Sequence, residues 1–300
     1  MKQIINPPES VWESIFARPT ASYESLEPIV SNVFEEVKVG GDAAVRKFTK
    51  KFDNVILTDF KVSEERLKNA ENEVSEELKA AIQKAKSNIE CFHEAQKTER
   101  VFVETMEGVN CWQEKRPIEK VGLYIPGGSA PLFSTLLMLA VPAQIAGCKE
   151  IILCTPPDEN GEVPAVICYA AALCGLTQLF AVGGIQAIAA MSLGTESIPK
   201  IYKIFGPGNQ YVTVAKQWAT RSNVSIDMPA GPSELLVVAD ASADADFIAA
   251  DLLSQAEHGP DSQVIFVTTA AEMLDKVTKS VKEQLKYLHR KVIAEKALAN

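Results

Sequence analysis

Gln255 and His258 stand three residues apart near the end of an expected helix, a spacing that places both side chains on one helix face. An imidazole is a common zinc ligand and an amide oxygen is a rarer one, so the pair could form half of a metal site. A zinc site needs three or four protein ligands, and only two are local here. The alternative is a histidine attracted to the negative end of a helix dipole beside a surface glutamine. The other two histidines, His93 and His289, lie in charged helical stretches, where solvated side chains are expected.

The helix that carries this pair follows an apolar strand. Residues 235–239 form a continuous apolar run, which predicts a strand covered on both faces. Ser242 is the expected helix cap, with Asp244 and Asp246 in the first turn, where the positive end of the helix dipole favours carboxylates. The Gly-Pro pair at 259–260 ends the helix directly after His258.

Three glycine-rich turns between strands and helices could bind a phosphate. They are YIPGGS (124–129), VGGIQ (182–186) and FGPGN (205–209). Each turn brings backbone N–H groups to a helix N-terminus, where a phosphate is stabilised by hydrogen bonds and by the helix dipole. None is a G-x-G-x-x-G or a Walker loop, and glycines required by tight turns are the alternative explanation. Three such turns in one sheet predict a nucleotide or dinucleotide site.

The elements that position these turns alternate between strand and helix, which predicts the α/β class with a parallel sheet. The strands are expected at 121–125, 150–154, 178–181, 200–204 and 224–226, with helices at 133–146, 163–173, 185–191 and 210–220. A further strand at 263–268 and helices at 270–286 and 289–300 follow the stretch around Gln255 and His258. In such sheets, ligands bind beyond the carboxyl ends of the strands, where the three glycine-rich turns lie.

The first 116 residues are charge-rich and mostly helical in pattern. Residues 25–39 form an amphipathic helix that Gly40-Gly41 ends, and Asp42 can start the next helix. A long helix is expected over 74–98, followed by a hairpin whose strands are 101–104 and 109–114.

Composition excludes several classes of partner. A formal net charge of -9 and a pI near 5.1 argue against nucleic acid or an anionic membrane surface as the main partner. The N-terminus lacks the apolar core of a signal peptide, and the two long uncharged runs, 121–148 and 163–195, are interrupted by turn residues. We therefore expect a cytoplasmic protein with no membrane span.

The six cysteines show no C-x-x-C pair and no zinc-finger spacing. Four of them lie in apolar segments, so buried free thiols in a reducing compartment are the favoured interpretation. A catalytic cysteine is the alternative.

Five long motifs carry a resemblance to a known family: KRPIEKVGLYIPGG (115–128), GGIQAIAAMSLGT (183–195), KIFGPGNQYVTVAK (203–216), IDMPAGPSE (226–234) and SQAEHGP (254–260). Through them almost the whole chain resembles the histidinol dehydrogenases. That family of oxidoreductases converts L-histidinol to L-histidine through L-histidinal, in two NAD-dependent hydride transfers at the end of histidine biosynthesis.

The resemblance also implies roles for individual residues. Tyr124, Gln186 and Asn209 would line the NAD site, one at each of the three glycine-rich turns. Gln255 and His258 would be zinc ligands that also touch the substrate, and the zinc would hold the imidazole and amine of L-histidinol in place.

Ser233 would be a further substrate contact by the same resemblance. The family's general acid and base is an adjacent Glu-His pair, which we expect beyond Asn300 together with the remaining zinc ligands. No catalytic residue is therefore assigned within the chain, and the 300 residues alone are expected not to turn over L-histidinol.

The resemblance further implies two Rossmann-like domains with a helical N-terminal segment, and a homodimer. Residues 1–22 would form the N-terminal arm, 23–118 with 228–300 a first, discontinuous domain, and 119–227 the NAD-binding domain. Two other functions remain open: a non-catalytic nucleotide-binding or scaffold protein with the same fold, and a cysteine-dependent aldehyde dehydrogenase using Cys111 or Cys148. We favour a structural role for both cysteines.

Overall fold

A computed structural model describes residues 2–17, 23–127, 131–229, 234–260 and 262–299. The chain divides into two compact units, a larger one formed by Tyr23–Pro229 and a smaller one formed by Met1–Ser22 with Ala230–Asn300. Both units contain parallel strands and covering helices, so the predicted α/β class is confirmed. The expected domain bounds divide the chain differently from these contact-based units and stay a prediction.

The larger unit is built on a five-stranded parallel sheet with the strand order β5-β4-β3-β6-β7. The strands are β3 (Lys120–Tyr124), β4 (Glu150–Thr155), β5 (Leu179–Ala181), β6 (Lys203–Phe205) and β7 (Ser225–Ile226). All five expected strands are therefore present. β6 begins three residues later than predicted.

Helices cover both faces of this sheet. α5 (Phe133–Ile145) and α6 (Ala165–Leu173) pack on one face, and α7 (Gly184–Leu193) and α8 (Gln210–Ala219) pack on the other. Side chains of β3 point to both faces because successive residues of a strand alternate. Val121 and Leu123 belong to the core beneath α5 and α6, whereas Tyr124 belongs to the core beneath α7 and α8. A short 3-10 turn, Thr220–Ser222, follows α8.

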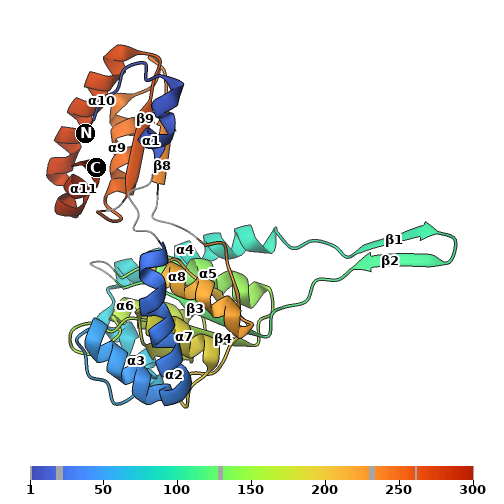
Figure 1. Cartoon of the computed structure of the whole chain (residues 1–300). Helices are drawn as coiled ribbons and strands as arrows, with labels where there is room; N and C mark the ends of the chain where they lie inside the picture. The colour runs from blue at the N-terminus through green and yellow to red at the C-terminus, as the bar shows by residue number, and fades with distance from the viewer. Residues whose placement is uncertain (1, 18–22, 128–130, 230–233, 261, 300) are drawn as a thin grey trace. The chain divides into compact units, whose positions relative to one another are not determined.

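The N-terminal helices add a second layer on each side. α2 (Tyr23–Phe52) packs on α7 and α8, and α3 (Glu64–Asn69), the 3-10 turn Ala70–Glu73 and α4 (Glu76–Glu94) cover α5 and α6 (Figure 1). Gly41 breaks α2 with φ +47°, and the N–H of Asp42 starts the second half by donating to Glu196 Oε2 at 2.7 Å. This confirms the predicted helix end at Gly40-Gly41.

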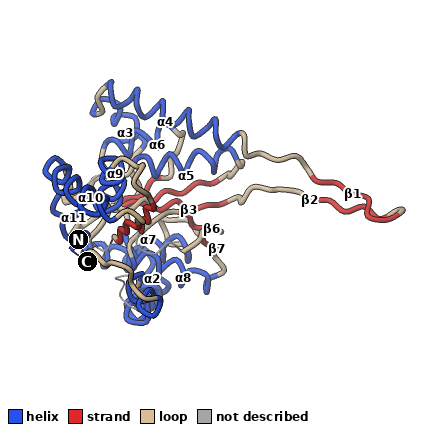
Figure 2. The backbone as a smooth tube through the Cα atoms, turned by 90° about the horizontal axis from the view of Figure 1, so that it is seen from above, coloured by secondary structure: helices blue, strands red, loops and turns tan. Residues whose placement is uncertain are grey.

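A hairpin arm extends from the larger unit, as Figures 1 and 2 show. Its strands are β1 (Val101–Met106) and β2 (Val109–Gln113), which pair antiparallel as predicted, and every residue of both strands is exposed. The exposed side chains include Phe102, Val103 and Trp112.

The smaller unit contains two parallel strands, β8 (Glu234–Val238) and β9 (Gln263–Val267), with the helices α9 (Ala245–Ala256), α10 (Ala271–Gln284) and α11 (Lys291–Ala299). The short segments Glu9–Val11, α1 (Trp12–Phe16) and Leu285–Tyr287 complete it. In the ranges that the structure covers, no helix combines the length and apolar character that a membrane span requires.

Two local predictions about the smaller unit are wrong. β8 is not covered on both faces: Val237 packs on the helices, while Leu236 and Val238 are 55% and 70% exposed. The cap of α9 is Asp244, whose side chain accepts the N–H of Asp246 at 2.7 Å. Ser242 instead donates its N–H and hydroxyl to the preceding Asp240, so it belongs to a turn before the helix.

Candidate functional site

The strand order of the larger sheet reverses between β3 and β6. In open α/β sheets, ligands bind at such a switch point, outside the carboxyl ends of the strands. The loops that leave β3 and β6 meet there. A Cβ built on Gly206, whose φ is +133°, would lie 2.1 Å from the carbonyl oxygen of Tyr124, so only glycine allows this approach.

An ion pair between a buried lysine and a partly exposed aspartate holds the β6 loop. Lys216, on α8, is 4% exposed, pairs with Asp227 and donates from Nζ to the Gly206 carbonyl at 2.7 Å. Asp227 Oδ2 in turn accepts the N–H of Gly206 at 2.8 Å. Both backbone polar groups of Gly206 are thereby satisfied. Sequence reasoning missed Lys216 and Asp227, although a lysine on the apolar face of a predicted helix was an available signal.

Asn209 lies where the glycine-rich turn predicted it, at the start of α8. Its Oδ1 accepts the N–H of Val212 at 3.1 Å and caps the helix. The side chain is exposed. Because the cap occupies Oδ1, the amide Nδ2 is the group that this residue can offer to a ligand.

Tyr124 lies at the end of β3 with its side chain buried against the other turn. Its hydroxyl accepts the N–H of Gly184, the first residue of α7, at 3.0 Å. Burial raises the pKa of the phenol, and the nearby Asp53 carboxyl raises the pKa further. The group therefore stays a neutral phenol.

Gln186 completes a polar cluster with Tyr124 and Asp53. It is 0% exposed, and its Nε2 donates to Asp53 Oδ2 at 2.9 Å, whereas its Oε1 has no hydrogen-bond partner. Burial raises the pKa of Asp53 to about 6, although the hydrogen bond from Gln186 opposes this rise. A strongly shifted carboxyl beside an unsatisfied amide marks a functional site. Asp53 was not predicted, because nothing local distinguishes an aspartate at a helix end.

The cluster fits a dinucleotide. Three of the predicted residues, Tyr124, Gln186 and Asn209, lie at the carboxyl ends of the parallel strands, and Tyr124 contacts the same turn that starts the helix of Gln186. Glycine-rich helix starts suit phosphates, and the orphaned Gln186 oxygen suits a hydrogen-bond donor.

The predicted metal ligands occupy the end of α9 in the smaller unit. The N–H of His258 donates to the Gln255 carbonyl at 3.1 Å, His258 is exposed, and Gln255 Nε2 is buried without a partner. The structure's described ranges hold no cluster of three or more His, Cys, Asp or Glu suited to a metal ion. Two donors do not make a zinc site by themselves. Ser233 lies outside the described residues.

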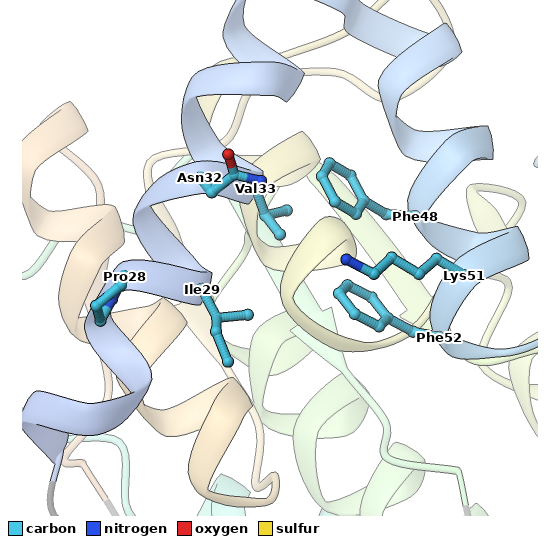
Figure 3. Close-up of a pocket in the computed structure, with 7 residues that line it drawn as sticks. All are labelled: Pro28, Ile29, Asn32, Val33, Phe48, Lys51 and Phe52. Atoms are coloured by element: carbon cyan, nitrogen blue, oxygen red, sulfur yellow. The ribbon is translucent and has the colours of Figure 1, made fainter.

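Two other hollows contain none of the predicted ligands. One of about 270 Å³ separates the halves of α2, where Ile29 and Val33 face Phe48 and Phe52 beside Lys51 (Figure 3).

The second hollow, of about 550 Å³, lies after β8 and β9 beside Asp240 and Glu272. Asp240 already accepts two hydrogen bonds from Ser242, which lower the pKa of its carboxyl.

Burial disfavours the thiolate form of four of the six cysteines. Burial raises the pKa of Cys168 and Cys174 to about 11 and raises that of Cys154 further, so their thiolates are scarce at neutral pH. Cys148 precedes the N-terminal end of β4, opposite the carboxyl ends where the glycine-rich turns lie, and its pKa is also raised by burial. Cys111 lies on the exposed hairpin arm.

Comparison with known proteins agrees with this geometry. A family model described as histidinol dehydrogenase matches residues 16–300. A histidinol dehydrogenase of Bacteroides fragilis (strain YCH46) is 58% identical over 300 residues, which are 100% of this chain and 70% of that protein. One from Escherichia coli (strain K12) is 54% identical over 287 residues, 95% of this chain and 65% of that protein.

A solved structure gives the same result. The crystal structure of histidinol dehydrogenase from Elizabethkingia anophelis matches with a TM-score of 0.93 and 57% identity, over 98% of this chain and 68% of that one. The resemblance predicted from the five motifs is confirmed. The chain belongs to the histidinol dehydrogenase family of oxidoreductases.

Proposed function

We propose that the protein oxidises L-histidinol to L-histidine through L-histidinal, with NAD as the oxidant. Family membership supports the reaction, and one observation supports the cofactor site: the buried Gln186 amide has an unsatisfied oxygen beside the switch point of the sheet. A bound NAD would accept one hydride in each of the two oxidations.

Within this proposal, the chain's own residues bind and orient the cofactor. Asn209 offers Nδ2 while its Oδ1 keeps α8 capped, and Gln186 offers Oε1. Tyr124 links the β3 loop to the start of α7 through its hydrogen bond with Gly184, so the two turns are held together as one surface. Holding a cofactor in a fixed geometry lowers the barrier of the reaction that follows.

We also propose that Gln255 and His258 contribute to a zinc site that includes further donors, and that Ser233 and this pair contact the substrate. The two residues are local to one helix end. The buried Gln255 Nε2 lacks an acceptor, which supports a polar contact with an acceptor group of the substrate and not a contact with the metal. The donors among the described residues are too few to hold the metal by themselves.

The cofactor site is tested by titrating NAD+ into the 300-residue chain and measuring heat. We expect saturable binding that Gln186→Ala weakens about tenfold, the loss of one buried hydrogen bond. Gln217→Ala is the matched control, because Gln217 is exposed on α8. Equal binding by wild type and Gln186→Ala would remove this assignment.

Turnover and zinc are tested separately. The resemblance places the Glu-His acid–base pair in the part of the longer relatives that this chain does not span, so we expect the 300 residues to bind NAD+ without steady NADH formation from L-histidinol. Sustained NADH formation would contradict this. In a family-length protein, His258→Ala should lower the zinc content, and His289→Ala should not. If the family-length protein bound NAD+ but did not turn over L-histidinol, a non-catalytic binding protein would be favoured.

We propose a homodimer as well. The hairpin arm exposes both faces of a two-stranded sheet, and such a sheet is only marginally stable without further packing. Its exposed Phe102 and Trp112 supply apolar area for contact with a second copy. Sedimentation equilibrium should show a dimer that Phe102→Ser/Trp112→Ser weakens, and a monomer at all concentrations would reject the proposal.

A further inference from the structure

Asp53 follows the last turn of α2 and is half-buried. Its backbone N–H donates to the Thr49 carbonyl at 2.9 Å, which continues the helical turn and fixes the residue's position. Its carboxylate accepts from Gln186, 133 positions along the chain. No lysine, arginine or histidine in the described ranges forms an ion pair with it. A half-buried carboxylate without a cation costs stability, so a packing role alone is a poor explanation.

The carboxylate decides how the Gln186 amide is oriented. An ionised carboxylate only accepts hydrogen bonds, so the glutamine must present its NH2 group to Asp53. Its carbonyl oxygen is then directed elsewhere, and no group in the described ranges donates to it. A buried oxygen without a donor is costly in the free protein.

The oxygen itself is buried against the start of α7. A Cβ built on Gly184 would lie only 3.0 Å from Gln186 Oε1, so the absence of a side chain at Gly184 leaves room for the oxygen in this position. Gly184 has φ +60° and its N–H is already taken by Tyr124. Among the described residues no group supplies the missing donor, so a bound ligand is the donor that we infer.

We propose that Asp53 is a positioning residue, which holds the Gln186 amide so that its oxygen accepts a hydrogen bond from a hydroxyl or carboxamide N–H of a bound dinucleotide. This rests on the NAD site proposed above. It adds that the chemical group recognised here is a donor, which excludes a phosphate oxygen at this contact.

The proposal implies a pH dependence. When Asp53 is protonated it becomes a donor, and the Gln186 amide can turn its oxygen toward the carboxyl instead of toward the ligand. The pKa of Asp53, raised to about 6 by burial, places this change just below neutral pH. Binding should therefore weaken as the pH falls through 6.

The other titratable groups near the carboxyl do not titrate in this range. Tyr124 faces it from β3 and Cys154 lies against Tyr124 from β4, and burial raises the pKa of both, so they stay protonated. Lys51, on the last turn of α2, lies over the ring of Phe52. Gln186 on α7 does not titrate.

The test measures the affinity of the 300-residue chain for NAD+ and for ADP-ribose by calorimetry between pH 5 and pH 8. We expect Asp53→Ala to weaken NAD+ about tenfold at pH 7.5. Asp53→Asn keeps an acceptor for Gln186, so it should bind within about threefold of wild type and should lose the inflection near pH 6. Asp59→Asn, at an exposed position six residues away, is the control.

Each outcome decides one question. An Asp53→Asn variant with the wild-type pH profile overturns the positioning role even if Asp53→Ala is unfolded. Wild-type affinity in Asp53→Ala, together with weak binding by Gln186→Ala, overturns the role of Asp53 and leaves the NAD site standing. No NAD+ binding by wild type overturns the NAD site itself and this inference with it. If Asp53→Ala weakens the binding of ADP-ribose as much as that of NAD+, the donor is a hydroxyl of the ADP-ribose part. If Asp53→Ala weakens only the binding of NAD+, the donor is the nicotinamide carboxamide.

Discussion

The two units differ in how completely helices cover their parallel strands. In the larger unit the central strands β3 and β4 are buried on both faces, because α5 and α6 pack on one side and α7 and α8 on the other. In the smaller unit, helices cover one face of β8, and Leu236 and Val238 are exposed on the other. Similar apolar runs therefore become a buried strand in one unit and a half-covered strand in the other.

The units also differ in whether the polar groups at their candidate sites have partners. In the larger unit Lys216, Asp227 and Gly206 satisfy one another. In the smaller unit Gln255 keeps a buried Nε2 without a partner, next to the exposed His258. In the larger unit, hydrogen bonds and an ion pair thus fix the loop at the candidate site. In the smaller unit, the described residues provide no such partner for the Gln255 amide nitrogen.

The largest expected effect is the loss of the ion pair under the β6 loop. Lys216→Met leaves Asp227 and the Gly206 carbonyl without their partner, which should cost about 3–5 kcal/mol of unfolding free energy. Urea denaturation measures this. Lys149→Met is the matched control, because Lys149 pairs with Glu119 on the surface. A Lys216→Met variant as stable as the control would show that the loop does not depend on the pair.

A second pair of variants compares the strands directly. Leu153 on β4 is 0% exposed, so Leu153→Ala should cost about 3 kcal/mol through lost burial and the cavity left behind. Leu236→Ala removes a side chain that is already half in solvent and should cost less than about 1 kcal/mol. Urea denaturation of both variants under one condition compares their losses of unfolding free energy. Equal costs would mean that the exposed face of β8 is covered in solution.

Much of the larger unit was predictable from the sequence, because its signals are local. Tyr124 and Asn209 were found because a strand, a glycine turn and a helix start follow one another in the sequence, and the break at Gly41 because two glycines interrupt an apolar stripe. Asp53 and Lys216 were missed because their partners are distant in the chain or lie in a loop of no regular pattern.

The errors in the smaller unit have a related cause. An apolar run reports that a strand can be buried, but the neighbours that bury it are set by the whole fold, so Leu236 was wrongly expected in a core. The shift of the α9 cap from Ser242 to Asp244 arose because both residues are good caps, and the turn made by Asp240 uses Ser242 first.

A third prediction concerns the pH dependence of stability in the larger unit. The folded protein raises the pKa of Asp53 from about 4 to about 6, so the native state binds this proton more tightly than the unfolded state. Stability contributed by this group therefore falls as the pH rises from 4 to 6 and stays low above 6. Because the carboxyl is partly exposed to solvent, the shift corresponds to roughly 1–2 kcal/mol rather than its full value.

Asp53→Asn should remove that dependence. The variant is expected to be more stable than wild type by about 1 kcal/mol at pH 7.5 and equal to it at pH 4, as measured by urea denaturation at both pH values. A difference between the two proteins that does not change with pH would contradict the raised pKa. The same variant thus separates the stability cost of the carboxylate from its proposed role in binding.

The smallest expected effect compares the two helix caps. Asn209 caps α8 and Asp244 caps α9, each through one hydrogen bond from its side chain. Replacing either residue with Ala should cost about 1 kcal/mol of unfolding free energy, because each change leaves one helix N–H without its acceptor. Only Asn209→Ala should also weaken NAD+ binding, since only this cap lies at the proposed cofactor site and offers Nδ2 to it. Matched losses of stability with no difference in NAD+ affinity would reduce Asn209 to a capping residue and would leave Gln186 as the polar side chain that the cofactor requires.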